Sequence, residues 1–341
     1  MKKINILTLL LILTIFLSLT ACGKSSSKEE VKQTYHQGLD KAGNEIVVPD
    51  NVETIISLSP VTTSFLIDLG LSDKIIGIDT ASNIYADSLS QEISQFDINQ
   101  DINQDIKDLN PDMVFISIDQ TSENHELFDK LQPLQKVRIC IVNIPPATSL
   151  DEISEDILAI GQLTGSDQKA KELSDKFNSE IDKYREISSR IYYKKRIFFQ
   201  MSLPEPDYPF VNTAGSKTYI DDMISTIGGI NAAAEEEETS TFYISLEEVA
   251  KLHPEVIVTN AYHEYDVAFA IATTAGWEKT KAVKNNEIYY IDLNTALQPN
   301  LHITDALNQM ALQVYPEAFS ELDNNTSNVE DSSEGDSEEA E

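Results

Sequence analysis

The hydrophobic positions of this chain form short apolar runs, separated by stretches in which apolar residues recur every three or four positions. The short runs predict buried strands, and the wider recurrence predicts amphipathic helices. In the first half we expect strands at 54–58, 74–78, 113–118 and 137–142, and helices at 61–69, 102–109 and 124–131. Alternation of strand and helix is typical of a mostly parallel α/β sheet.

The second half repeats this scheme, with strands expected at 196–201, 256–259 and 288–291 and helices at 219–227, 246–252 and 304–314. Two segments, 104–115 and 247–258, also match each other directly: a helix ends at Leu-x-Pro and an acidic residue precedes a buried strand. Proline cannot continue a helix and disfavours the α conformation in the residue before it. The repeat therefore predicts two lobes of similar architecture.

Between the halves, Gly165-Ser166-Asp167 interrupts two helical patterns. In the second pattern, apolar residues recur at helical spacing from Ala170 to Ile191. A helix over about 168–191 would be roughly 35 Å long at 1.5 Å per residue. We expect this helix to join the two lobes.

The N-terminus has the features of an export signal: Lys2 and Lys3, an apolar run over 4–19, and small residues before Cys22. The run is shorter than the roughly 20 residues that cross a bilayer. Leu19-Thr20-Ala21-Cys22 resembles the bacterial lipobox, in which the cysteine is acylated and becomes the mature N-terminus. The resemblance implies cleavage after Ala21 and a membrane anchor on Cys22.

Charge and cysteine content narrow the possible partners. The formal net charge is −32, and residues 321–341 carry nine acids without lysine or arginine, which predicts a disordered tail. Nucleic acid is excluded as a partner, because its phosphates would be repelled. Cys140 is the only other cysteine, so acylation of Cys22 leaves no disulfide within the chain, and we expect Cys140 to be a buried small hydrophobe.

Several short segments together resemble the substrate-binding proteins of ABC importers for ferric siderophores, heme or cobalamin. They are 43–49, 55–60, 69–78, 109–112, 213–217, 227–231, 276–277 and 282–285, in this order behind the lipobox. The resemblance covers about residues 37–320. It implies an α/β fold of two Rossmann-like lobes, joined by a single long α-helix, with a ligand cleft between them.

We therefore expect six parts. They are a lipoprotein signal peptide (1–21), a linker after lipidated Cys22 (22–36), an N-terminal α/β lobe (37–150), an inter-lobe helical segment (151–193), a C-terminal α/β lobe (194–320) and the acidic disordered tail (321–341).

The ligand site is expected beyond the carboxyl ends of the strands, where ligands bind in open α/β sheets. Aromatic residues there, with Tyr208 and Phe210, could form walls against a planar or macrocyclic ligand. The predicted cleft residues are Ser59, Pro60, Val61, Tyr85, Gly215, Ser216, Lys217, Tyr243, Tyr262, His263 and His302.

Two of these residues carry side chains that suit iron, namely Tyr262 and His263. Heme-binding relatives have a histidine ligand near this place, but their partner methionine has no counterpart in 97–109. The alternative is that both are ordinary polar or stacking residues of a cleft loop. His302 could equally cap the last helix. No stretch shows the ligand spacing of a zinc site.

The resemblance also implies two acids that contact arginines of the permease. Glu247 matches the acid of the second lobe, whereas Gln104 stands at the equivalent place in the first lobe. Asp105, one residue further on, could replace it, as could Asp101 or Asp108. The alternative is that these acids belong to a solvated charged surface.

The resemblance implies a protein without enzymatic activity or intrinsic cofactor, and none of the common catalytic motifs is present in the sequence. We expect a monomer on the outer face of the cytoplasmic membrane that binds an iron chelate, either a ferric siderophore or heme, and delivers it to an ABC permease and its ATPase. The alternatives are a cobalamin-binding protein of such an importer, or an adhesin or signalling lipoprotein that has kept the fold without transport.

Overall fold

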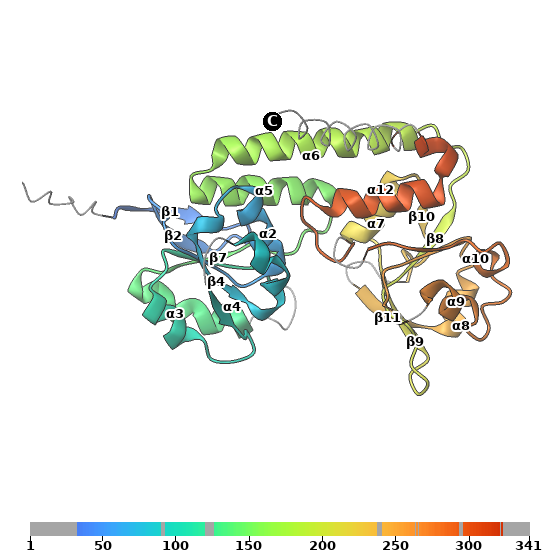
Figure 1. The fold of residues 1–341 in the computed structure, drawn as a ribbon, viewed down its shortest axis with the longest axis horizontal. Helices are drawn as coiled ribbons and strands as arrows, with labels where there is room; N and C mark the ends of the chain where they lie inside the picture. The colour runs from blue at the N-terminus through green and yellow to red at the C-terminus, as the bar shows by residue number, and fades with distance from the viewer. Residues whose placement is uncertain are drawn as a thin grey trace, which may run out of the picture. The chain divides into compact units, whose positions relative to one another are not determined.

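The computed structural model describes residues 33–89, 93–119, 126–236, 241–262, 264, 266–292, 296–320 and 322 (Figure 1). The predicted signal peptide, Cys22 and nearly all of the acidic tail lie outside this part of the chain. No helix within it combines the length and the apolar character needed to cross a membrane.

The first lobe is built on a five-stranded parallel sheet with the strand order β5-β4-β3-β6-β7. Apolar residues on both faces of these strands are buried, because helices cover both sides of the sheet. The elements are β3 (Ile55–Ser57), α2 (Pro60–Asp68), η1 (Ser72–Lys74), β4 (Ile75–Asp79), η2 (Thr80–Ser88), β5 (Ser94–Phe96), α3 (Asn103–Leu109), β6 (Met113–Ile116), α4 (Glu126–Leu131), η4 (Gln132–Val137) and β7 (Cys140–Asn143).

The second lobe has a four-stranded parallel sheet with the order β10-β8-β12-β13 and a separate antiparallel pair, β11-β9. Trp277 is fully buried, as expected for a core residue, and meets Phe198 edge-on. The elements are β8 (Arg196–Gln200), β9 (Phe210–Ala214), α7 (Tyr219–Thr226), β10 (Ile230–Asn231), β11 (Thr241–Ser245), α8 (Leu246–Lys251), β12 (Val256–Thr259), α9 (Val267–Ala272), α10 (Lys281–Lys284) and β13 (Ile288–Tyr290).

The internal repeat is confirmed at the level of backbone conformation. Asn110 ends α3 with φ 48°, and His253 stands at the equivalent place after α8 with φ 52°. At both places the next residue is proline, and the acid after it accepts a backbone hydrogen bond at the start of the neighbouring strand. Asp112 accepts a hydrogen bond from Thr54 N at 3.0 Å, and Glu255 accepts one from Arg196 N at 3.1 Å.

Two antiparallel helices, α5 (Leu150–Thr164) and α6 (Asp167–Ser188), connect the lobes (Figure 1). Gly165, at φ 71°, ends α5 in the left-handed conformation that favours glycine. A Cβ on Gly161 would lie only 2.3 Å from that of Ala170, so the corner requires glycine at this close approach. The 22 residues of α6 extend about 33 Å, and α6 is the expected long connecting helix, which ends three residues earlier than predicted.

One hydrophobic core continues from the first lobe to the second. It contains Phe115 of the first sheet, Phe177 of α6 and Phe199 of the second sheet, and it extends to the last helix, α12 (Ile303–Val314). Cys140 is part of this core and is 3% exposed, as expected, and burial raises the pKa of its thiol to about 12. Because close-packed side chains resist deformation, we expect the two lobes to be held stiffly.

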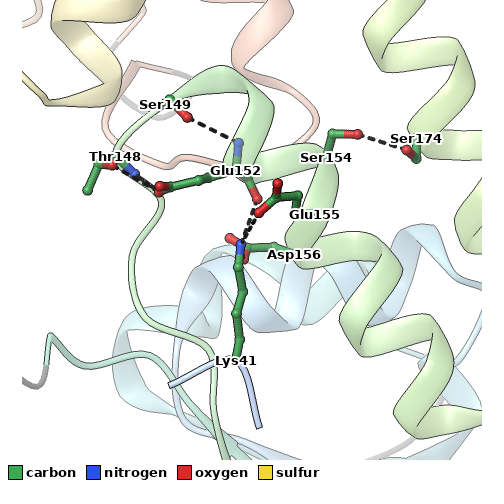
Figure 2. A network of polar contacts seen from close by, with 8 residues as sticks. All are labelled: Lys41, Thr148, Ser149, Glu152, Ser154, Glu155, Asp156 and Ser174. Atoms are coloured by element: carbon green, nitrogen blue, oxygen red, sulfur yellow. Dashed lines mark hydrogen bonds and ion pairs between the residues drawn. The ribbon is translucent and has the colours of Figure 1, made fainter. Parts of the chain in front are cut away.

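A polar network fastens the N-terminal hairpin, β1 (Tyr35–Leu39) and β2 (Glu45–Pro49), to α5 (Figure 2). Lys41, in the turn of this hairpin, forms an ion pair with the buried Asp156 and donates a hydrogen bond to Glu152 O at 3.0 Å. On the same helix Ser154 Oγ lies 2.8 Å from Ser174 Oγ of α6. The hairpin, α5 and α6 are thereby joined by polar contacts as well as by the core.

The structure corrects two details of the predicted elements. The strand expected from residue 137 begins at Cys140, because η4 continues to Val137 and Arg138 turns the chain at φ 68°. The hairpin's first strand begins at Tyr35, two residues before the expected start of the first lobe.

Candidate functional site

The carboxyl end of the first sheet has a connected set of buried hydroxyl groups. Ser57, at the end of β3, lies 2.7 Å from Thr62 Oγ1 and 2.8 Å from Thr63 Oγ1, both on α2. Thr63 donates to Ser82 Oγ at 3.1 Å, and Ser82 donates to Asp79 at the end of β4. Burial raises the pKa of Asp79. These bonds fix the start of α2 relative to η2.

The predicted residues Ser59, Pro60 and Val61 lie at this same edge. Ser59 is buried and precedes α2, but its side chain makes no capping hydrogen bond, and Pro60 is the first residue of the helix. Val61 is partly buried against the core. These residues therefore belong to the start of α2, at the edge where the ligand is expected.

A pocket of about 380 Å³ is lined by residues of both lobes. Its volume is within the range of ligand sites in proteins, roughly 300–1,000 Å³. The first lobe contributes side chains of α2 and η2, and the second contributes the start of α12 and the loop before it. The lining residues are Ser64, Ile67, Asp68, Ile84, Tyr85, Ser88, Asn300, His302 and Asp305.

The structure thus brings Tyr85 and His302, both predicted for the cleft, to one pocket, although 217 positions (302 − 85) separate them in the sequence. The Tyr85 hydroxyl donates to Gln298 Oε1 at 2.6 Å, and Asn300 Nδ2 donates to the same hydroxyl at 3.4 Å. These hydrogen bonds cross from one lobe to the other.

A second contact between the lobes joins His302 Nε2 to Asp68 Oδ1 at 3.2 Å. This hydrogen bond raises the pKa of His302. His302 directly precedes α12, but its side chain does not cap that helix. The side chain of His302 therefore lines the pocket and does not cap α12, which was the alternative role.

The predicted residues of the second lobe lie on other elements. Gly215, Ser216 and Lys217 follow β9, and Thr218 caps the next helix through its side chain. Tyr243, on β11, is 56% exposed and belongs to an aromatic group in which its ring lies 5.7 Å from that of Tyr208. None of these side chains lines the pocket described above.

Tyr262 lies after β12, at the carboxyl edge of the second sheet, and is 78% exposed. His263 lies outside the described residues, so its proposed contact with the ligand stays a prediction. Among the residues that the structure describes, no group of three or more histidine, cysteine, aspartate or glutamate side chains is placed to hold a metal ion.

Sequence reasoning missed most of the pocket lining, including Ser64 and Asp68 of α2 and Asn300 before α12. The helical pattern of 61–69 shows which residues face the core, but it cannot show that a loop of the other lobe covers one end of the helix. Asn300 lies two residues before His302, and this proximity was the only available signal.

The two predicted docking acids occupy equivalent helices. Asp105 lies in the first turn of α3 and Glu247 in the first turn of α8, and both are exposed. Glu247 forms an ion pair with Lys251 at 2.8 Å, and Gln104 donates to Asp108 at 2.7 Å. The repeat therefore places both acids in the first turn of equivalent helices, although Asp105 lies one residue beyond the position that matches Glu247.

Each of the two α/β lobes is built on a parallel sheet, and α5 and α6 join them. Both lobes line one pocket. This arrangement defines a two-lobed solute-binding protein. The sequence profile of the periplasmic binding protein family matches residues 55–295. The chain belongs to this family, and its fold is the one that the resemblance implied.

Two relatives and one solved structure show how far the similarity extends. An uncharacterized ABC transporter substrate-binding lipoprotein of Bacillus subtilis, YvrC, is 26% identical over 94% of this chain and 99% of its own length. A cobalamin-binding protein of Halobacterium salinarum is 24% identical over 80% of this chain and 72% of its own. A possible iron-binding (periplasmic solute-binding) protein of Staphylococcus epidermidis has a TM-score of 0.66 at 25% identity, over 78% of this chain and all of its own.

Proposed function

We propose that this protein is the lipid-anchored capture subunit of an ABC importer, which binds an iron chelate and delivers it to a membrane permease. The observation that carries the proposal is the pocket formed jointly by Tyr85 and His302, one residue from each lobe, in a chain of this family. The similarity to an ABC transporter substrate-binding lipoprotein supports the transport role. No catalytic role or intrinsic cofactor is part of the proposal.

The iron chelate would be a ferric siderophore or heme. The volume of about 380 Å³ suits part of such a ligand, and the exposed Tyr243 and Tyr262 are the further contacts that we propose for it. Cobalamin is the second candidate, because a relative that spans most of this chain is a cobalamin-binding protein.

The permease would contact Asp105 and Glu247. Both acids lie in the first turn of equivalent helices, so a permease with two similar halves could contact one acid of each lobe. The ion pair of Glu247 with Lys251 is exposed, and exposed pairs are weak, so a permease arginine could replace the lysine.

The test is native mass spectrometry of the protein purified from its own host. We expect a bound species whose mass corresponds to an iron chelate. A cobalamin mass would favour the second candidate, and a protein that never retains or binds any metal chelate would contradict the proposal.

We further predict that Cys22→Ala abolishes membrane attachment, because Cys22 is the only cysteine available for acylation at the end of the signal. Fractionation of cells should then show the variant unprocessed or released, whereas Cys140→Ala, which alters the buried cysteine, should remain attached. A Cys22→Ala protein that is processed and membrane-bound like the wild type would disprove the anchor.

A further inference from the structure

Charge is distributed unequally between the two ends of the parallel strands. Among the described residues, the segments between the carboxyl ends of these strands and the next helix or strand contain no lysine or arginine. They carry only acids as permanently charged groups: Asp97, Asp101, Asp119, Glu205, Asp207, Glu235, Glu236, Glu264, Asp266 and Asp292.

The general acidity of the chain does not explain this pattern, because cations are present at the opposite ends of the same strands. The segments that precede β4, β7 and β8 contain Lys74, Lys136, Arg138, Arg190, Lys194 and Lys195. Lys217, a predicted cleft residue, follows β9 of the antiparallel pair and not a parallel strand. The carboxyl edge of both sheets is therefore electronegative.

The pocket itself has the same character. Its lining includes Asp68 and Asp305 but neither lysine nor arginine, and the one ionisable nitrogen, on His302, already contacts Asp68. The positive charge of a protonated His302 would therefore be offset by the carboxylate of Asp68. A cleft lined by one sign of charge attracts ligands of the opposite sign and repels those of its own sign.

Uncharged polar groups at this edge indicate what else the ligand carries. Asn260, directly after β12, is fully buried, and neither atom of its amide has a hydrogen-bond partner among the described residues. Gln200, at the end of β8, is also fully buried, and its Oε1 has no such partner. Buried polar atoms are rarely left unpaired, and an amide both donates and accepts. Neither side chain lines the pocket described above, but both lie at the carboxyl edge, and their unpaired atoms could pair with uncharged amide or hydroxamate groups of a ligand.

We infer that the cleft selects an uncharged or positively charged chelate that bears amide or hydroxamate groups, and that it discriminates against polyanionic chelates. The inference rests on the proposed function and narrows its substrate class. It favours ferric hydroxamates over ferric catecholates and over heme, whose carboxylates are anionic.

Calorimetric titration of the lipid-free mature protein tests the inference with two ferric siderophores of opposite charge. Ferrioxamine B is a cationic trihydroxamate, and ferric enterobactin is an anionic tris-catecholate. At about 0.01 M salt we expect the trihydroxamate to bind at least about tenfold more tightly. The preference should shrink at about 0.15 M salt, because the Debye length falls from roughly 30 Å to roughly 8 Å.

A charge-neutralised variant and a matched control make the test specific. Glu235→Gln/Glu236→Gln/Glu264→Gln removes three exposed acids of the carboxyl edge, and Glu172→Gln/Asp175→Asn/Glu186→Gln removes three exposed acids of α6. The first variant should reduce the ratio of trihydroxamate affinity to catecholate affinity by about threefold or more. The second variant should leave this ratio unchanged.

Equal or tighter binding of the catecholate at low salt would overturn the inference while supporting the proposed function, because a chelate would still bind. An equal change of the affinity ratio in both variants would also overturn the inference. Cobalamin, which carries many amides and no strong anionic charge, is the third ligand to titrate. If cobalamin were the only one of the three ligands to bind, the inference would be supported and the protein would be the cobalamin-binding protein of an importer. Binding of no chelate by folded protein would overturn the proposed function and the inference together.

Discussion

Replacement of Lys41 by methionine is expected to destabilise the protein by about 3 kcal/mol at pH 8, since it leaves the carboxylate of Asp156 buried without a counter-ion. The Asp156 side chain is 1% exposed and that of Lys41 is 22% exposed. Glu155, the other acid near Lys41 Nζ at 3.7 Å, is 66% exposed and can turn to solvent. The loss of stability therefore arises at Asp156 of α5.

The destabilisation by Lys41→Met should depend on pH. Burial raises the pKa of Asp156 to about 7, while Lys41 opposes this shift. A carboxyl whose pKa is higher in the folded protein binds protons more tightly there, so its contribution to stability is complete below about pH 4 and is lost as the pH rises through 7. Without Lys41 the folded pKa should rise further. The variant should thus lose more stability than the wild type between pH 5.5 and pH 8.

Urea denaturation of both proteins at these two pH values measures the effect. The control is Lys41→Met/Asp156→Leu, which replaces the pair by apolar groups and should recover most of the lost stability, because the desolvated charge is gone. Wild-type stability of Lys41→Met at pH 8, or a double variant no more stable than the single one, would show that Asp156 is not a buried charge held by Lys41.

The sequence predicted the strands with long apolar runs, namely β3, β4, β6 and β7 of the first sheet and β8, β12 and β13 of the second, because each has a strong local signal. It did not predict the strands β5, β9, β10 and β11. The predicted strand 256–259 and the predicted helix start at Tyr219 coincide with β12 and α7. Helix ends were less accurate where the chain leaves a helix without glycine or proline. Thus α6 ends at Ser188 although the apolar recurrence continues to Ile191, which packs against the core beyond the helix.

The pairing of strands and the pocket lining were harder to predict, since both depend on residues far apart in the sequence. The antiparallel pair of β9 and β11 places Asn212 opposite Tyr243, and nothing within either strand specifies that partner. Position at the carboxyl end of a strand identified Tyr85, and resemblance to a family identified His302, each separately. The contacts of each with the other lobe, through Gln298 and Asp68, follow only from the packing of α12 and the loop before it.

The largest effect on ligand binding is expected from Tyr85→Ala, which should weaken the affinity for the chelate that the titrations identify by roughly tenfold to a hundredfold. The ring of Tyr85 forms part of the pocket wall, and an aromatic face packs well against a chelate's apolar or planar surface. The variant also loses the 2.6 Å hydrogen bond to Gln298, which joins η2 to the second lobe. The first loss removes a contact with the ligand, and the second weakens the connection between the lobes that shapes the pocket.

Tyr85→Phe separates these two contributions. It keeps the ring and removes only the hydroxyl, so its affinity should fall by about threefold to tenfold, the range expected for one hydrogen bond worth about 0.5–1.5 kcal/mol. Calorimetry is the suitable measurement, because Trp277 is fully buried in the core of the second lobe and does not line the pocket. Circular dichroism must show that both variants are folded. If folded Tyr85→Ala bound the chelate as tightly as the wild type, the ligand would have to lie elsewhere, and the exposed Tyr262 would become the next position to replace.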